Sequence, residues 1–369
     1  MTTSETTRPV DEPVPGGTPS TVPTTEELEA ARPWYQAELA HGVERFLEDR
    51  RDTCPWCGSG RLRPRLDTGD LMQRKPGKFH IDECRTCGHV FQNPRLNIDG
   101  LNFYYRDFYD GLGAHTVEMI FAAHKDIYIE RAKMLTPFLT PRNWLDVGTG
   151  YGHFCKDART VWPNTVFDGL DMGHGVLEGK ARGWLDTIYH GMLPDLADQV
   201  AGKYDVVSMH HYLEHVRDPR AELDVVAEIM APGSYLLTEV PDPTSITARI
   251  FGKWWAPWFQ PQHQNLIPCR NLLQALAERG FTPVTVHRKS AHIPVDVTCA
   301  VLSMCTVLGP DPRLPWGKGP TKVGELRNKY VWKAAPPLVK AAYKADQRLA
   351  PLIKATDGGN AYRVLARKG

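Results

Sequence analysis

Short apolar runs recur through the middle of the chain, and longer stretches that mix apolar and charged residues separate them. The runs lie at residues 144–147, 166–171, 187–190, 204–209 and 232–240. Strands of a parallel sheet have this composition, because helices cover the sheet on both faces. A helix at residues 271–280, a strand that starts at Phe281 and a last strand at residues 361–368 complete the pattern. The pattern predicts an α/β fold with a mostly parallel sheet.

Three alternating glycines end the first run, in the sequence Trp-Leu-Asp-Val-Gly-Thr-Gly-Tyr-Gly at residues 144–152. Gly148, Gly150 and Gly152 let the backbone turn sharply and approach a ligand where a Cβ would collide. A dinucleotide fingerprint would need a further glycine at the position of His153. The loop therefore suits a different ligand, and a plain tight turn is the alternative.

A carboxylate closes the second run, Val166-Phe-Asp-Gly-Leu-Asp171. Ligands of open α/β sheets bind outside the carboxyl ends of the strands, where an acid can accept hydrogen bonds from both hydroxyls of a ribose. We expect Asp171 in this role, with Met172 packing on the nucleoside. The alternative is a solvated strand-end or helix-capping aspartate.

Four landmarks follow one another in order along the chain. They are the glycine loop, Asp171, the segment His210-His-Tyr-Leu-Glu-His-Val-Arg-Asp-Pro219 and the strand after the turn at Pro232. Together they resemble class I S-adenosylmethionine (AdoMet)-dependent methyltransferases. The resemblance implies a Rossmann-like sheet, mostly parallel with an antiparallel last strand, and AdoMet as co-substrate. Its contacts would be Asp146, Gly148, Thr149, Gly150 and Gly152 for the methionine part, Asp171 and Met172 for the nucleoside, Met192 and Leu193 near the adenine, and His210 at the edge of the crevice.

Two cysteine pairs, Cys54-Pro-Trp-Cys57 and Cys84-Arg-Thr-Cys87, form a second motif, and a glycine follows each pair. Thiolates two residues apart can face one ion when a turn brings the backbone round, and the trailing glycine permits that turn. Four such sulfurs predict a structural Zn²⁺ site. Two disulfides and a redox pair are the alternatives, but nothing in the chain indicates export to an oxidising compartment.

The zinc lobe continues as Gly88-His-Val-Phe-Gln-Asn-Pro-Arg95. This continuation resembles bacterial methyltransferases with an N-terminal zinc lobe, and sugar methyltransferases of antibiotic pathways carry a comparable lobe. By this resemblance the lobe closes over the acceptor, with Tyr104, Tyr105 and Tyr109 on the substrate side. Alternatively, these aromatics only fill the seam between the lobe and the catalytic domain.

Histidines supply the candidate general bases, because the ordinary pKa of histidine lies near neutrality. His211 is the first choice, just past the fourth strand, and His215 belongs to the signature of the resembling family. His263 ends an aromatic loop that starts at Trp254. Structural roles remain the alternatives for His215 and His263. The aromatic loop either packs down or binds an apolar ligand.

The two ends of the chain depart from a minimal methyltransferase. We expect a disordered tail at residues 1–25, then a helix from Thr25 to about Arg51 that a capping box at residues 24–27 begins. Residues 297–308 are apolar and expected to be buried. Residues 322–354 hold eight Lys/Arg against two acids, and Pro336 and Pro337 should divide them into two helices. Such a basic amphipathic stretch can rest on an anionic membrane surface or meet an acidic ligand, but it is more often a solvated helical lid or an oligomer contact, and we favour the lid or packing helix.

The expected domain boundaries follow from these motifs. They are a tail at 1–25, an N-terminal helix and zinc-binding lobe at 26–110, an AdoMet-binding catalytic domain at 111–290, a helical insertion or lid at 291–355 and a final strand of the catalytic sheet at 356–369.

Composition narrows the function further. The net charge is +1, so no general field attracts polyanions. No apolar run reaches the roughly 18 residues of a membrane span, and the start of the chain has no signal-peptide core. We expect a cytoplasmic enzyme that methylates a small natural-product, sugar or polyketide acceptor at oxygen or carbon, with no nucleic-acid partner. A homodimer and a peripheral membrane contact stay open. The alternative functions are an RNA methyltransferase that grips RNA with the zinc lobe, and a non-catalytic AdoMet-binding protein.

Overall fold

The computed structural model describes residues 22–108, 112, 114–289 and 295–369. Its larger sheet has seven strands in the order β10-β11-β8-β7-β4-β5-β6. The strands are β4 (Asn143–Val147), β5 (Val166–Asp171), β6 (Ile188–His190), β7 (Val206–His210), β8 (Tyr235–Pro241), β10 (Phe281–His287) and β11 (Ala361–Lys368). Each expected strand is therefore present, and the last one has the expected bounds.

The strands from β4 to β8 run parallel, and β11 runs antiparallel to both β8 and β10. Chain order reverses between β4 and β7, so the carboxyl ends of these strands flank the switch point where ligands of open α/β sheets bind. The expected mostly parallel sheet with an antiparallel last strand is confirmed.

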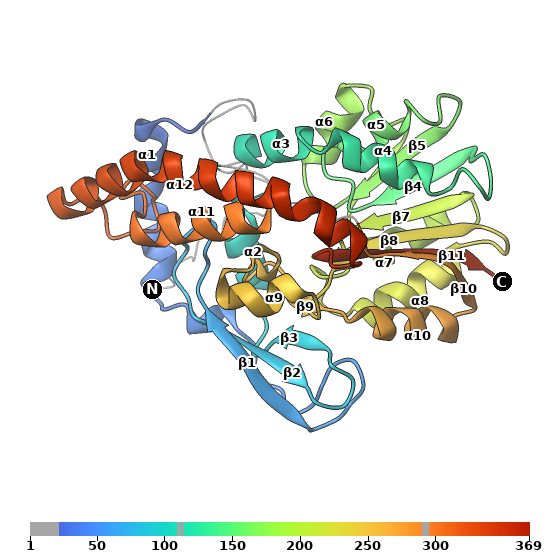
Figure 1. Cartoon of the computed structure of the whole chain (residues 1–369), viewed down its shortest axis with the longest axis horizontal. Coiled ribbons are helices and arrows are strands. Elements are labelled where there is room, and N and C mark those ends of the chain that lie inside the picture. Colours follow the sequence, from blue (N-terminus) through green and yellow to red (C-terminus); the bar gives the residue numbers. More distant parts are fainter. Residues whose placement is uncertain (1–21, 109–111, 113, 290–294) are drawn as a thin grey trace, which may run out of the picture.

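Helices cover both faces of this sheet (Figure 1). One core cluster joins the strands to α7 (Leu193–Val200), α8 (Pro219–Ile229) and α10 (Cys269–Glu278). The other joins them to α4 (Lys125–Lys133), α5 (His153–Ala158) and α6 (Gly175–Ala181). This double cover explains why the central strands read as nearly continuous apolar runs.

A smaller antiparallel sheet lies at the bottom of Figure 1, in the order β1-β2-β3-β9. Its strands are β1 (Leu62–Thr68), β2 (Phe79–Cys84), β3 (Val90–Gln92) and β9 (Asn265–Leu266). Since β9 comes from the segment after β8, the small sheet is completed by a strand from far along the chain. The N-terminal helices are α1 (Thr25–Leu39), η1 (Glu44–Phe46), α2 (Ile98–Tyr105) and α3 (Ala114–Ala122).

The first helix is shorter than expected. The capping box at Thr24 and Glu27 is confirmed, but α1 ends at Leu39 and not near Arg51. Gly42 follows with a φ of +80°, a left-handed conformation that ends regular helix. The expected tail at residues 1–25 lies, as far as residue 21, outside the described residues.

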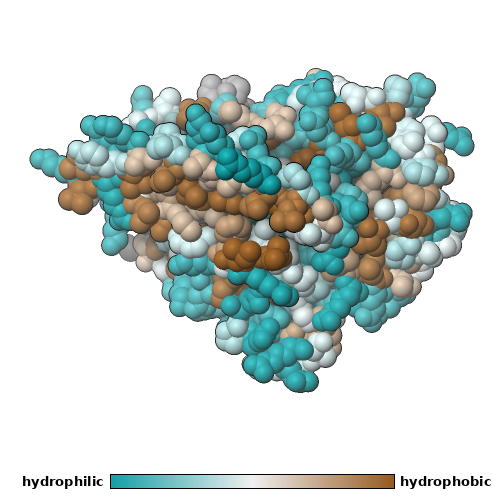
Figure 2. Space-filling model, in the orientation of Figure 1, coloured by the Kyte–Doolittle hydropathy of each residue, from teal (hydrophilic) through white to brown (hydrophobic). Residues whose placement is uncertain are grey.

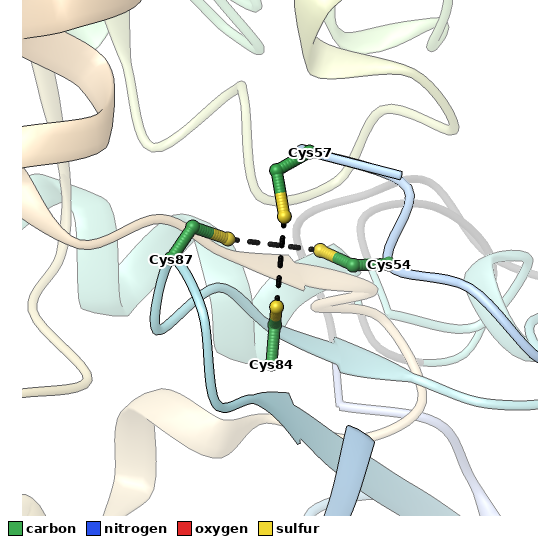
Figure 3. Close-up of side chains that lie close together, drawn as sticks. All are labelled: Cys54, Cys57, Cys84 and Cys87. Atoms are coloured by element: carbon green, nitrogen blue, oxygen red, sulfur yellow. Dashed lines mark hydrogen bonds between the residues drawn. The ribbon is translucent and has the colours of Figure 1, made fainter. Parts of the chain in front are cut away.

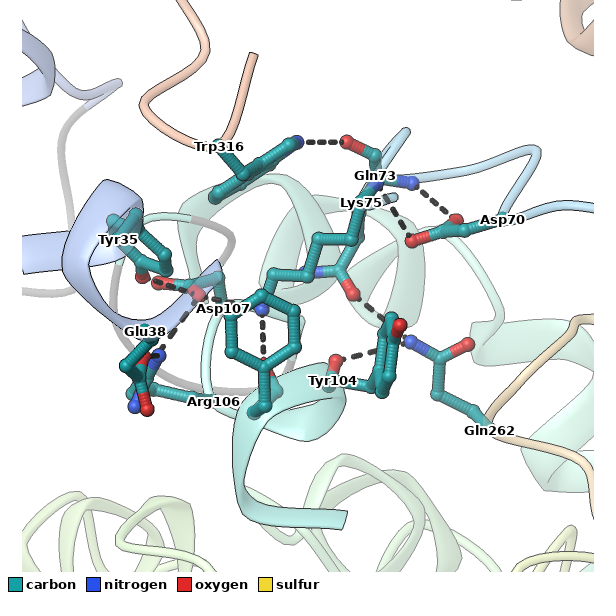
Figure 4. Close-up of polar contacts among 11 residues, drawn as sticks. Tyr35, Glu38, Asp70, Gln73, Lys75, Tyr104, Arg106, Asp107, Gln262 and Trp316 are labelled. Carbon is teal, nitrogen blue, oxygen red and sulfur yellow. Dashed lines mark hydrogen bonds and ion pairs between the residues drawn. The ribbon is translucent and has the colours of Figure 1, made fainter. Parts of the chain in front are cut away.

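A buried polar network joins the N-terminal elements (Figure 4). Lys75 Nζ lies 2.7 Å from Asp107 Oδ2, and both side chains are 0% exposed. Asp107 also accepts a hydrogen bond from Tyr35 of α1, at 2.5 Å. Trp316 donates its indole N–H to the backbone oxygen of Gln73, and its ring lies 5.1 Å from Lys75 Nζ. The network thus ties α1, the loop after β1 and the segment before the last helix together.

The C-terminal insertion consists of helices. It contains α11 (Asp296–Leu308) and α12 (Lys322–Ala355), and α9 (Ile246–Phe251) with the short helices η3 (Gly252–Trp254) and η4 (Ala256–Trp258) lies nearby. The expected break at Pro336 and Pro337 was wrong, because α12 continues through both. A proline removes one hydrogen bond and bends a helix without ending it where the flanking turns are held, and α12 packs along α11.

The expected burial of residues 297–308 holds for one side of α11 only. Ala300, Ser303 and Cys305 are buried, whereas Leu308 is 56% exposed. None of the helices in the described ranges has the length and apolar character that crossing a bilayer requires.

Candidate active site and metal centre

The glycine loop connects β4 to α5 at the carboxyl edge of the sheet. Gly148, Gly150 and Gly152 have φ values of +74°, +55° and +83°, a region that residues with a side chain rarely adopt. A Cβ on Gly148 would lie 2.7 Å from Cδ2 of Tyr212, whereas nothing lies within 4 Å of a Cβ on Gly150. The loop is therefore packed on one side and open at its tip, as a ligand cradle requires.

The expected acidic residues flank this loop. Asp171, at the end of β5, accepts hydrogen bonds from the backbone N–H groups of Gly150 (2.8 Å) and Gly173 (2.7 Å). Asp146 is buried, accepts a hydrogen bond from Ser208 Oγ at 2.5 Å, and burial raises its pKa to about 7. Asp171 thus stands at the surface of the loop, while Asp146 joins β4 to β7 beneath it.

Met172, expected to pack on the nucleoside, and Met192 and Leu193, expected near the adenine, lie in different surroundings. Met172 is 65% exposed and Met192 is 42% exposed, so both side chains are open to a ligand. Leu193 is fully buried in the core cluster that α7 helps to form. Met192 is therefore exposed enough to contact a ligand, whereas Leu193 packs in the core.

His210 ends β7, and its ring lies 4.6 Å from that of Phe154. Both ring nitrogens are buried, and no hydrogen-bond partner is found for them among the described residues. Burial holds the pKa of His210 well below its usual value. A buried polar group without a partner is costly, so His210 fits a place beside a polar ligand atom.

His211 has a φ of +53° and lies between two carboxylates. Its Nδ1 is 2.9 Å from Glu214 Oε1, and its Nε2 is 3.0 Å from Glu239 Oε1. Burial opposes its charge, but these carboxylates raise its pKa above the ordinary value. Glu239 also accepts hydrogen bonds from the buried side chains of Arg131 and Arg363. Both ring nitrogens of His211 are therefore held in a buried charge network.

His215 and His263 form a second pair, with ring centroids 4.5 Å apart. One ligand atom from each of them and a carboxylate oxygen of Glu214 lie within 4.8 Å of one another. Burial lowers the pKa of both histidines to about 3, so both are neutral near pH 7.

Hydrogen bonds fix which nitrogen of each ring carries the proton. His263 Nδ1 lies 2.8 Å from the backbone oxygen of Pro257, which can only accept. Tyr105 donates its hydroxyl to the backbone oxygen of Gln262 at 2.6 Å, so its oxygen accepts from His215 Nδ1 at 2.9 Å. In both neutral rings Nε2 is then the unprotonated nitrogen.

The tyrosines expected on the substrate side divide between two roles. Tyr104 is 1% exposed and donates its hydroxyl to the backbone oxygen of Pro76, so it fills the lobe core. Tyr105 reaches His215, and Tyr109 lies outside the described residues. In the aromatic loop Trp255 and Trp258 are buried, so most of this loop packs down.

The four cysteines converge in the N-terminal lobe and point toward one centre (Figure 3). Sγ of Cys54 lies 3.7 Å from that of Cys87, and Sγ of Cys57 lies 3.6 Å from that of Cys84. A tetrahedron with Zn–S bonds of about 2.3 Å has sulfurs about 3.8 Å apart. A disulfide would need about 2.05 Å. The spacing therefore fits a shared tetrahedral ion and excludes two disulfides.

The glycine after each cysteine pair permits the turn, as expected from the sequence. Gly58 and Gly88 have φ values of +73° and +76°, and each donates its backbone N–H to the oxygen of the first cysteine of its pair, at 2.9 Å and 2.8 Å. Four thiolates would fill every position of a tetrahedral ion and leave none open for a substrate, so the ion would have a structural role.

Sequence reasoning missed Glu214, Glu239 and Tyr212 as parts of the site. A charged residue inside an apolar strand, such as Glu239 in Leu-Leu-Thr-Glu-Val, is the signal that marks a buried ion pair. Tyr212 gave no such signal, because its contact with Gly148 depends on the path of the backbone after β7.

Comparisons with known proteins agree with this geometry. A family model described as "Methyltransferase domain" matches residues 123–286. The ubiquinone biosynthesis O-methyltransferase of Erwinia tasmaniensis is 34% identical over 94 residues, which is 24% of this chain and 38% of that protein. Its counterpart from Vibrio parahaemolyticus is 35% identical over 101 residues, which is 25% of this chain and 40% of that protein.

The chain thus spans about two fifths of the length of these relatives. Among solved structures, an S-adenosylmethionine-dependent methyltransferase from Archaeoglobus fulgidus shares 16% identity, with a TM-score of 0.42 over 72% of this chain and 98% of that one. The strand order, the glycine loop and the family match agree on one part of the chain: residues 123–286 match a methyltransferase domain.

Proposed function

We propose that the protein transfers the methyl group of AdoMet to a small-molecule acceptor, with His215 or His263 as the general base. AdoMet supplies an electrophilic methyl group, and a hydroxyl or acidic carbon must lose a proton to accept it. Asp171, the glycine loop, Met172 and Met192 would hold AdoMet. Tyr212 links the two parts of the site, because it packs against Gly148 and lies three residues before His215.

The convergence of His215, His263 and Glu214 is the observation that carries this proposal. Two neutral imidazoles with unprotonated Nε2 atoms lie beside a carboxylate that can stabilise the imidazolium formed when one of them takes a proton. Because burial lowers the pKa of both rings, each is unprotonated near pH 7 and can take a proton. The names of the matched relatives, which are O-methyltransferases, support oxygen as the methylated atom.

The sequence predicted His211 as the general base, but this proposal gives it a different role. A base needs a free lone pair, and both of its nitrogens face carboxylates. We assign it to orienting Glu214, whose other oxygen is buried with no hydrogen-bond partner among the described residues.

The remaining parts of the chain receive supporting roles. We propose that Cys54, Cys57, Cys84 and Cys87 hold one structural zinc ion, and that the lobe at residues 26–110 borders the acceptor site of a catalytic domain at residues 111–290. Contact of Tyr105 with His215 supports this placement, because Tyr105 lies on α2.

The test compares His215→Asn and His263→Asn with the surface control His41→Asn. AdoMet affinity, measured by calorimetry, should stay close to wild type in all three. Transfer of labelled methyl groups into an extract of cells that make the protein should fall by about a hundred-fold or more in at least one of the first two. Wild-type transfer in both His215→Asn and His263→Asn would contradict the assignment of the base. Wild-type transfer in His41→Asn alone would support it.

A further inference from the structure

The longest helix of the protein is hardly buried. Of the 34 residues of α12, Ala335, Ala342 and Asp346 are the buried ones. Asp346 fixes the helix to α11, because its carboxylate accepts hydrogen bonds from the backbone N–H groups of Val297 and Thr298, each at 2.9 Å. A helix about 50 Å long is thus held along one narrow side.

One flank of α12, next to its buried side, carries an exposed apolar stripe. Its members are large side chains that are 42% to 76% exposed: Val323, Leu326, Tyr330, Leu338, Leu349 and Leu352. At 100° per residue these positions fall within one arc of about 140°, which Arg327 and Arg348 share, whereas the exposed Tyr343 lies outside it. In Figure 2 a brown band of hydrophobic residues runs along α11 and α12, and a second brown group lies over α9. Ile246 and Ile250 of α9 are 59% and 69% exposed.

Basic residues adjoin the stripe. Lys322, Lys329, Lys333, Lys340 and Lys344 share an arc of about 60° next to the apolar one, on the side opposite the buried alanines. With eight Lys/Arg and two acids, the helix has a net charge of +6, although the whole chain has only +1. The rest of the molecule is therefore net acidic, and the positive charge is concentrated on this helix.

From this surface we propose that α12 docks the protein on an anionic lipid membrane. The apolar stripe would enter the boundary between headgroups and acyl chains, and the flanking lysines would meet acidic headgroups. An exposed apolar band beside a row of lysines is the pattern of helices that lie in a membrane surface. This inference is independent of the methyl-transfer proposal, since it uses none of the residues of the glycine loop or the histidine cluster.

A second copy of the chain is the competing occupant. A dimer formed through this face would bring two helices of charge +6 together, and like charges at close range oppose association. An anionic surface is attracted by the same charges. Charge complementarity therefore favours the membrane.

Flotation of the full chain with lipid vesicles tests the proposal. One vesicle set contains phosphatidylcholine with roughly a third phosphatidylglycerol, and the other contains phosphatidylcholine alone. We expect binding to the anionic set and binding at least about ten-fold weaker to the neutral set. High salt should weaken binding to the anionic set.

Matched variants separate this surface from general charge. Lys340→Gln with Lys344→Gln should weaken binding to anionic vesicles about ten-fold or more, and so should Leu338→Gln with Leu349→Gln. The control Lys133→Gln with Lys203→Gln removes the same charge from exposed lysines outside α12 and should leave binding unchanged. Circular dichroism verifies that each variant is folded.

Three results would overturn the proposal. They are absent or equal binding to the two vesicle sets, an equal loss in the control pair, and a dimer in light scattering that the Leu338 and Leu349 changes split. The last result would assign the stripe to a second copy.

Discussion

The carboxylate of Asp171 accepts a hydrogen bond from the backbone N–H of Gly150, with 2.8 Å between nitrogen and Oδ2. This contact fixes the tip of the glycine loop against the end of the neighbouring strand. It places an acid at the edge where a ribose would bind and sets the loop geometry at the same time.

Removal of this carboxylate should weaken AdoMet binding. In Asp171→Ala we expect the dissociation constant from calorimetry to rise about ten-fold or more, because both the ribose contact and the loop anchor are lost. Asp198→Ala, on the exposed side of α7, is the matched control and should bind normally. Equal affinities of the two variants would remove Asp171 from the cofactor site.

The cysteine cluster predicts about one zinc ion per chain in protein purified without added metal. Mass spectrometry of the metal content measures this directly. Cys57→Ser should lose most of the metal and lower the melting temperature, whereas Cys299→Ser, outside the cluster, should keep it. A wild-type protein without metal would contradict the assignment.

The charge network around His211 predicts a dependence of stability on pH. The folded pKa of His211 is raised above the unfolded value, so its stabilising contribution is fully present below about pH 6.5, the unfolded pKa. The contribution is lost as the pH rises through the folded pKa.

We therefore expect His211→Asn to be destabilised more at pH 5.5 than at pH 9, relative to wild type in urea unfolding. His41→Asn, a surface change, should show no such difference. A destabilisation of His211→Asn that grows with pH would show that the histidine is not held as a cation.

Lys75 and Lys78 offer a comparison between a buried and an exposed ion pair in one loop. The Lys75–Asp107 pair is fully buried, whereas the Lys78 side chain is 66% exposed beside Asp67. Lys75→Met should lower the free energy of unfolding by about 3–5 kcal/mol, since it removes the buried cation closest to Asp107 and leaves Arg106 Nε at 3.9 Å. Lys78→Met should cost at most about 1 kcal/mol. Denaturant unfolding measures the free energy of unfolding of both variants. Similar small losses of this free energy in both would mean that buried Asp107 is not stabilised by Lys75.

The local patterns predicted the sheet because each strand carries its own signal. The bounds of β5 and β11 follow from short apolar runs, and the glycines at 148, 150 and 152 mark the turn whatever the surroundings. The cysteine spacing likewise predicted the geometry of the metal site, because the two residues between the cysteines of a pair and the glycine after it determine each turn.

Features that depend on contacts between distant parts of the chain could not be predicted from local sequence patterns. The partners of His211 come from β8 as well as from its own loop, so its two carboxylates could not be foreseen. The course of α12 through Pro336 depends on its packing along α11, and the burial of Leu193 depends on the core cluster beneath α7.

The central claim is methyl transfer to a small molecule, and one measurement tests it most directly. The protein is incubated with isotope-labelled AdoMet and an extract of cells that make it, and the products are separated by size. We predict that the label enters the small-molecule fraction and is absent when Asp171→Ala replaces the wild type. Label in RNA or protein, or no label in any fraction, would contradict the account.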